Sequence, residues 1–245
     1  MKNRILYVAL LGSMVSSIIL SGCKKEEDNT PSKNETESFM DSRDQKTYKW
    51  VKIGNQVWMS ENLAYTGGSM RHITDNTEWE GNLTYDGWCT YENDVDNRGA
   101  YGVLYQWEAA KEACPEGWHL PTLEEWIVLE DYLKDNNYSY DGVTGNAFTG
   151  KSLATDTAWN VSSTVGTIGN NDFPAYRNKT GFSALPGGYR WFSDGSFRDL
   201  GIVGIWWSAS DDDGNSNVSP PTQNRALTPS IFHPKVKNAN GGETC

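Results

Sequence analysis

The sequence predicts an α+β domain that is rich in turns and short strands, and three local patterns support this. Residues 48–59 contain two runs of β-forming side chains separated by a Gly-Asn pair, which is typical of a tight hairpin. A second hairpin is expected at residues 189–198, where Asp-Gly would form the turn. Thr122 and Glu125 have the spacing of a capping box, which marks the first turn of a helix.

The remaining elements follow from hydrophobic spacing and turn residues. Residues 64–99 predict either a long loop region or a set of short strands joined by turns. A short helix is expected at residues 104–113, and the capped helix should end near residues 134–137. Residues 136–178 should be dominated by loops, and the apolar run at residues 202–210 predicts a buried strand. The capped helix should pack into the core through Trp126, Leu129 and Leu133.

The first 22 residues have the features of a secretory signal peptide. Lys2 and Arg4 precede an apolar run of about 16 residues, which is shorter than the roughly 20 residues that span a membrane comfortably. The sequence Leu-Ser-Gly-Cys that follows resembles a bacterial lipobox, which implies that Cys23 carries lipid and begins the mature protein. The alternative is an ordinary secretory signal that leaves Cys23 as a thiol.

The segment after Cys23 predicts a surface-exposed tether. Residues 24–28, Lys-Lys-Glu-Glu-Asp, resemble the export tag of surface lipoproteins in Bacteroidetes-type bacteria, although such a run is also typical of a solvated linker. Residues 23–46 are polar and should form a disordered tether, which leaves residues 47–245 as the folded domain. We therefore expect a lipoprotein that is anchored in the outer membrane by its lipid and faces the cell exterior.

Charge and cysteine content exclude some partners. The chain has a net charge of −11, and removal of the signal-peptide cations makes it more negative, which disfavours binding to nucleic acid. Cys89, Cys114 and Cys245 remain after lipidation of Cys23, and an odd number of thiols cannot pair completely within one chain. The sequence does not indicate an oligomeric state.

No pattern in the sequence supports catalysis, so we expect a non-enzymatic protein without catalytic or cofactor-binding residues. The sequence contains no nucleophile-elbow motif and no phosphate-binding loop. His119 is expected to be packed and hydrogen-bonded. The acidic pairs within residues 124–131 are explained by helix capping and solvation.

Two acidic turns offer oxygen atoms to a metal ion. Calcium takes about six to eight oxygen ligands, so neither turn is sufficient alone. We therefore keep bound calcium as one expectation and solvated acidic turns as the other. The candidate metal ligands are Asn93, Asp94, Asp96, Asp211, Asp212 and Asp213.

Five motifs, in the same order, resemble the Fibrobacter succinogenes major paralogous domain. The resemblance extends over roughly residues 48–217. The motifs are VKIGNQVWMSENL at residues 51–63, YGVLYQWEAA at 101–110, ACPEGWHLPT at 113–122, GFSALPGG at 181–188 and WWSAS at 206–210.

This family resembles a branch of the C-type-lectin-like fold, which implies a curled antiparallel β-sheet with two short helices and long loops. The motif at residues 117–122 also resembles the formylglycine-generating enzymes of that fold, which use cysteines in their C-terminal part. Here no cysteine lies between Cys114 and Cys245, so the resemblance supplies no catalytic residue.

The C-terminal part departs from the family pattern from about residue 218. Residues 224–227 resemble the lead-in to a closing strand, but residues 228–245 contain proline and glycine where the family has a strand with a cysteine. We interpret this as a frameshift or a truncated copy. The resemblance then implies that Cys114 lacks its usual disulfide partner, unless Cys245 replaces it.

Together, these observations predict a surface-exposed, lipid-anchored binding protein whose expected ligand is a glycan or another extracellular molecule. An aromatic ring can stack on a sugar ring while its polar edge keeps a hydrogen bond, although most tryptophans should be core residues. The alternatives are a structural or adhesive module that contacts envelope proteins, and an inactive truncated paralogue. The stacking candidates, chosen from loops and hairpins, are Trp79, Trp88, Tyr91, Trp159 and Trp191.

Overall fold

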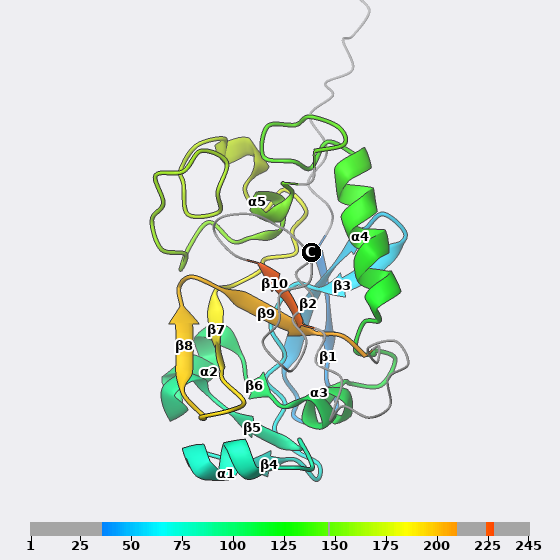
Figure 1. The fold of residues 1–245 in the computed structure, drawn as a ribbon. Helices are drawn as coiled ribbons and strands as arrows, with labels where there is room; N and C mark the ends of the chain where they lie inside the picture. The colour runs from blue at the N-terminus through cyan, green and yellow to red at the C-terminus, as the bar shows by residue number, and fades with distance from the viewer. Residues whose placement is uncertain (1–35, 147, 210–223, 228–245) are drawn as a thin grey trace, which may run out of the picture. The chain divides into compact units, whose positions relative to one another are not determined.

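The computed structural model describes residues 36–146, 148–209 and 224–227, all of which belong to the larger of two compact units, residues 33–245. Within these ranges the chain forms three small sheets and several short helices, which confirms an α+β fold (Figure 1). None of the helices in the described ranges combines the length and apolar character that crossing a bilayer requires.

The strands of the described ranges form sheets with the orders β1-β2-β3, β4-β5-β6 and β10-β9-β7-β8. Their bounds are β1 (Thr36–Met40), β2 (Thr47–Ile53), β3 (Gln56–Met59), β4 (Arg71–His72), β5 (Gly87–Cys89), β6 (Leu104–Tyr105), β7 (Gly187–Arg190), β8 (Phe197–Leu200), β9 (Gly204–Trp207) and β10 (Asn224–Leu227). The helices are α1 (Asn76–Gly81), α2 (Asp96–Tyr101), α3 (Trp107–Ala113), α4 (Leu123–Asp135) and α5 (Gly150–Leu153), with 3-10 turns η1 (Tyr91–Asn93) and η2 (Pro174–Tyr176).

The first predicted hairpin is confirmed by the pairing of β2 with β3. The strands are antiparallel, with Ile53 opposite Gln56 on either side of the Gly54-Asn55 turn. Gly54 has a φ of +60°, and a Cβ atom there would lie 2.8 Å from the ring of Tyr132. Both the left-handed backbone and the close approach of the ring therefore require glycine at this turn.

The prediction of a disordered tether up to residue 46 is wrong from Thr36 onward. Strand β1 pairs antiparallel with β2, with Thr36 opposite Val51. The ring of Phe39 stacks on Tyr48 at 5.8 Å and on Trp118 at 4.9 Å between centroids. Residues 23–35, which include Cys23, lie outside the described residues.

Polar side chains hold the end of β1 in place, which explains why composition alone suggested disorder. Asp41 is 2% exposed and accepts hydrogen bonds from Arg43 at 3.0 Å and 2.7 Å. The same guanidinium donates to the carbonyls of Ala113 and Cys114, at 2.7 Å and 3.2 Å, where α3 ends. It also lies 3.7 Å from the ring centre of Tyr65. A cation at the C-terminal end of a helix is favoured by the helix dipole.

Helix α4 and its capping box are confirmed. The Thr122 hydroxyl accepts a hydrogen bond from the backbone N–H of Glu125 at 3.2 Å, and the Glu125 carboxylate accepts one from the Thr122 N–H at 2.8 Å. The helix ends at Asp135, as the spacing predicts.

The main core lies under α4. As predicted, Trp126, Leu129 and Leu133 are buried there. The ring of Trp126 is 4.8 Å from that of Trp58 on β3 and 6.3 Å from Phe182. Burial of this apolar area is the main force that holds α4 against the first sheet.

The predicted helix at residues 104–113 is only partly correct. Residues 107–113 are helical, but Leu104 and Tyr105 form β6, where they pair with Cys89 and Trp88 of β5. Residues 64–99 form short strands and turns, as one alternative held, together with α1 and α2, which the sequence did not predict. Tertiary pairing has overridden the helical spacing at residues 104–105.

The second hairpin is confirmed in the third sheet. Strands β7 and β8 are antiparallel, with Arg190 opposite Phe197. The apolar run at residues 202–210 provides the shorter strand β9, which pairs antiparallel with β10. The interpretation of residues 228–245 as a poor closing strand falls outside the described residues.

The loop-rich segment of residues 136–186, which we call the long loop region, is held to the core by backbone hydrogen bonds around α5. The Ser152 carbonyl accepts from the Thr180 N–H at 3.0 Å, and the Leu153 carbonyl accepts from the Ala184 N–H at 2.9 Å. Figure 1 shows α5 enclosed by the loops of this region. The prediction of loops is therefore confirmed.

The contacts of Asp41 predict an acid-sensitive start of the domain. Burial opposes ionisation, but the hydrogen bonds from Arg43 dominate and lower the pKa of Asp41. A lowered pKa stabilises the fold above the ordinary carboxyl range, and this contribution is lost as the pH falls through the folded-state pKa. Asp41→Asn should cost about 1–3 kcal/mol at neutral pH and flatten the acid limb of stability, as measured by urea unfolding. Asp44→Asn, at an exposed neighbour, should change neither.

Candidate functional site

The candidate site is built on the hairpin between β7 and β8. The Trp191 N–H donates to the Ser196 carbonyl at 2.8 Å, and the Gly195 N–H donates to the Trp191 carbonyl at 3.0 Å. The Asp194 carboxylate accepts from the Ser196 N–H at 2.8 Å and from its hydroxyl at 2.6 Å. Gly195 approaches Asn76 so closely that a Cβ atom would lie 2.6 Å from the Asn76 Cα. The turn is therefore fixed against the start of α1.

Arg190, on the inner side of the hairpin, joins it to residues 73–76 by hydrogen bonds. Its guanidinium is buried and donates to the carbonyls of Ile73, Thr74 and Gly195, at 2.6 Å, 3.0 Å and 2.9 Å. It also donates to the side-chain oxygen of Asn76 at 2.9 Å.

Two aromatic rings enclose the same guanidinium. Its central carbon is 4.5 Å from the ring centre of Trp79 and 4.8 Å from that of Phe197. A buried cation is tolerated when its donors are paired in this way, and the rings add a cation–π attraction. Arg190 is thus the internal anchor of the hairpin.

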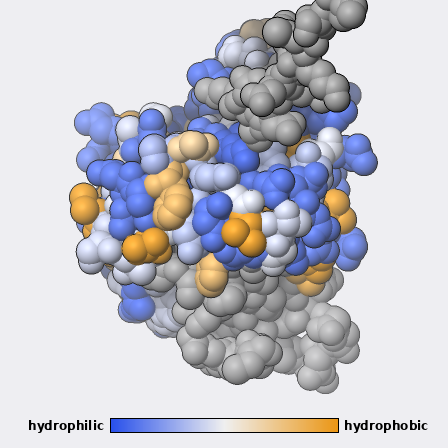
Figure 2. All heavy atoms as spheres, turned by 90° about the horizontal axis from the view of Figure 1, so that it is seen from above, coloured by the Kyte–Doolittle hydropathy of each residue, from blue (hydrophilic) through white to orange (hydrophobic). Residues whose placement is uncertain are grey.

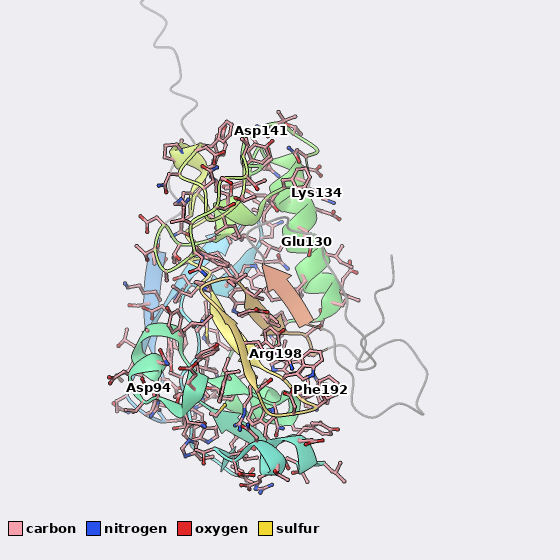
Figure 3. The ribbon with its side chains drawn as sticks, turned by 60° about the vertical axis from the view of Figure 1, so that its left-hand side comes forward. Asp94, Glu130, Lys134, Asp141, Phe192 and Arg198 are labelled. Atoms are coloured by element: carbon pink, nitrogen blue, oxygen red, sulfur yellow. The ribbon has the colours of Figure 1, made fainter. Side chains whose placement is uncertain are left out.

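Successive side chains of a strand point to opposite faces, so the burial of Arg190 directs its neighbours outward. Tyr189, Trp191 and Phe192 form what we call the hairpin aromatic patch. The Trp191 ring is 6.0 Å from Tyr189 and 4.9 Å from Phe192, and Phe192 is 46% exposed. Figure 3 shows Phe192 and Arg198 at the same end of this hairpin.

Polar groups surround the hairpin aromatic patch. The Arg198 guanidinium lies 4.9 Å from the Trp191 ring centre and pairs with Asp194 at 2.7 Å. Hydrogen bonds from Ser196 lower the pKa of Asp194, which remains ionised. Burial and the nearby Asp199 raise the pKa of Tyr189, so its hydroxyl stays protonated at neutral pH. The patch therefore offers flat apolar rings beside both donors and acceptors.

The five stacking candidates are not brought together. Trp191 belongs to the hairpin aromatic patch, but the choice of Trp79 and Tyr91 as accessible rings is wrong because both are buried. Trp79 lies against Arg190, and Tyr91 packs 5.3 Å from Phe197.

The two other candidates are largely occupied by contacts within the domain. His72 stacks on Trp88 at 4.1 Å, and Trp159 packs against the core and donates to the Ala184 carbonyl at 3.3 Å. Tyr189 and Phe192 were missed. The alternation along residues 189–192 could have identified Tyr189 as the partner of Trp191.

The side chains of the acidic turn at residues 93–96 make hydrogen bonds to backbone groups of the domain. Asn93 donates to the Thr74 carbonyl at 3.0 Å, and Asp94 accepts from the Asp96 N–H at 3.0 Å. Asp94 lies on the other side of the domain from Phe192 (Figure 3). Within the described ranges no three His, Cys, Asp or Glu residues are grouped so that they could hold a metal ion. Asp211, Asp212 and Asp213 lie outside these ranges, so calcium binding stays a prediction.

The groups with the potential for acid–base or thiol chemistry have structural contacts. The ring of His119 is hydrogen-bonded to the Glu125 carboxylate at 2.8 Å, as expected, but its side chain is 68% exposed instead of packed. Cys89 and Cys114 are free thiols in the part of the chain that the structure describes. Burial raises the pKa of both to about 11, which suppresses thiolate reactivity near neutral pH.

Comparison with known proteins identifies the family. The Fibrobacter succinogenes major domain matches residues 51–236. The chain belongs to this family. All five sequence motifs and the hairpin aromatic patch lie within the matched part of this family domain, whereas β1 and the start of β2 precede it. No curated protein and no solved structure matches the chain significantly.

Because Arg190 anchors the hairpin, we expect its substitution to lower the stability of the domain strongly. Arg190→Met would remove the hydrogen bonds to the carbonyls of Ile73, Thr74 and Gly195 and to the Asn76 side chain, and should lower the free energy of unfolding by about 3 kcal/mol or more. Arg190→Lys should be intermediate, because an ammonium cannot reproduce the planar fork of donors. Urea unfolding measures both, with Arg198→Met as the partly exposed arginine control. Equal stability of the Arg190→Met and Arg198→Met proteins would contradict this role.

Proposed function

We propose that this family domain is a non-catalytic binding module that a lipid at Cys23 anchors to the outer membrane, facing the cell exterior. We further propose that it binds a glycan through the hairpin aromatic patch. The observation that carries the binding proposal is the exposed Phe192 beside Trp191, on a hairpin held by a buried arginine. The anchoring proposal is supported by the signal-like sequence of residues 1–22 and the lipobox resemblance.

The chemistry of the hairpin aromatic patch suits a sugar. Flat rings cover the apolar face of a pyranose, and sugar hydroxyls need both donors and acceptors at the rim. Ser196, Asp194 and Arg198 provide such groups on the same hairpin. Because the hairpin is already fixed through Arg190, little ordering entropy would be lost on binding.

The relation to C-type-lectin-like proteins is also part of this proposal. Small, mostly antiparallel sheets, short helices and the long loop region at residues 136–186 are compatible with that architecture. Calcium need not take part at the hairpin aromatic patch, because the aromatic rings and polar side chains named above supply the contacts.

A protein-contacting envelope module is the second candidate, and one observation favours it. Strand β8 is at the end of its sheet, and an exposed aromatic ring such as that of Phe192 near a sheet edge is also suited to contact another protein. The two candidates differ in whether a purified glycan is sufficient for binding.

The test is a glycan array probed with the whole protein in detergent. Phe192→Ala should weaken binding to the retained glycan about fivefold, since a ring contact contributes about 1 kcal/mol. Phe148→Ala, a similarly exposed phenylalanine in the long loop region, is the matched control and should bind normally. Addition of a chelator should leave binding unchanged.

Three outcomes would contradict the proposal. Unchanged binding by both Phe192→Ala and Trp191→Ala would exclude the hairpin aromatic patch. Loss of binding on chelation would favour a calcium site elsewhere. Absence of binding by a protein with an intact near-ultraviolet circular dichroism spectrum would favour the envelope module.

A further inference from the structure

Lys151 is an unusual residue for the interior of a domain. It lies on α5, and its side chain is 0% exposed. An ammonium group is costly to bury unless charge and hydrogen bonds compensate it. The surroundings of this group must therefore explain why a lysine is tolerated here.

Three oxygen atoms surround the Lys151 Nζ. It donates to the backbone carbonyls of Asn170 at 2.9 Å and Asp172 at 2.6 Å, and to the Oδ1 atom of the Asp172 carboxylate. A lysine ammonium has three donors, and each has an acceptor here. All three oxygens belong to one loop, residues 164–177, and they converge on the ammonium of Lys151.

The loop is folded so that it presents these oxygens. The other carboxylate oxygen of Asp172 accepts from the Gly166 N–H at 2.7 Å, and the Asp172 N–H donates to the Asn170 side chain at 2.9 Å. Arg177 donates to the Asn170 carbonyl at 2.5 Å. A combination of backbone carbonyls and a carboxylate from an irregular loop is the ligand set that calcium uses in proteins.

We propose that the ammonium of Lys151 is the resident cation of loop 164–177 and takes the place that a metal ion would occupy. Its charge is paired with the carboxylate of Asp172, and its three N–H groups match the three oxygens. Calcium would need about six to eight oxygens, more than converge here. The loop is thus ordered by a covalently attached cation and needs no calcium. This inference is independent of glycan binding.

The order imposed by Lys151 extends to the surface of the long loop region. Phe173 directly follows Asp172, has a φ of +45° and is exposed. Its ring meets that of Tyr140 at 5.2 Å, edge to face. A left-handed backbone at a bulky residue persists only where its surroundings fix it, and the pinned Asp172 supplies that constraint. Figure 2 shows the loop face, where hydrophobic side chains lie scattered among hydrophilic ones.

The pair should persist into mildly acidic solution. Burial tends to raise the pKa of Asp172, but hydrogen bonds from Lys151 and Gly166, with the charges of Lys151 and Arg177, outweigh it and lower the pKa. The loop should therefore loosen only as the pH falls below the ordinary range of aspartate.

Limited proteolysis of the whole protein in detergent tests the proposal, with cleavage sites mapped by mass spectrometry. The wild type should resist cleavage within residues 164–177 equally in excess EDTA and in calcium chloride. Lys151→Met, which keeps the length of the side chain but removes the ammonium, should be cleaved there about tenfold faster or more, in both solutions. Lys134→Met is the control, because Lys134 lies on α4 and pairs with Asp131 at the surface.

Two results would overturn the proposal. One is cleavage of the wild-type loop that EDTA accelerates or calcium suppresses, since a metal would then hold it. The other is a Lys151→Met loop as resistant as that of the wild type. If Lys151→Met fails to fold, Asp172→Asn keeps the lysine and both carbonyls and allows the same comparison. Faster cleavage of its loop supports the proposal, and unchanged resistance overturns it.

Discussion

The buried guanidinium of Arg190 is the interaction on which the candidate site depends. It joins the β7–β8 hairpin to residues 73–76, which are more than a hundred positions earlier in the chain. Because Arg190 points inward between Trp79 and Phe197, the rings on either side of it must point outward. One side chain therefore sets both the position of the hairpin and the face that it presents.

Arg190 is one of several cations that serve this purpose in a domain with little regular structure. Arg43 binds the carbonyls at the end of α3, and Lys151 binds those of loop 164–177. Loops leave many carbonyls without the partners that a helix or sheet would supply, and buried carbonyls need donors. One guanidinium or ammonium can donate to several carbonyls at once. These three cations therefore supply hydrogen bonds that a helix or sheet would otherwise provide.

The features predicted correctly from the sequence depend on residues close together in the chain. The Gly54-Asn55 turn, the Asp194-Gly195 turn and the capping box at Thr122 each involve only a few adjacent positions. The errors arose where distant contacts decide the outcome. Strand β1 is polar and is ordered by Arg43 and the ring of Trp118, and Trp79 is buried by Arg190. Among the five stacking candidates, Trp191 is the one that lies in the hairpin aromatic patch, and its hairpin was itself recognisable from the sequence.

The pairing of β1 with β2 also determines how the domain would respond to mechanical load. The two strands are antiparallel, and Thr36 pairs with Val51 at the end where the chain enters the sheet. Hydrogen bonds in such a pair run perpendicular to the strands. Tension on the chain ahead of Thr36, directed across the strands, would therefore load these bonds one residue pair at a time, beginning with Thr36 and Val51. Strand β2, whose Val51 and Ile53 lie in the core, would be loaded only after β1 had been released. Strand β1 would thus be released first, and its release would shield the core from such a pull.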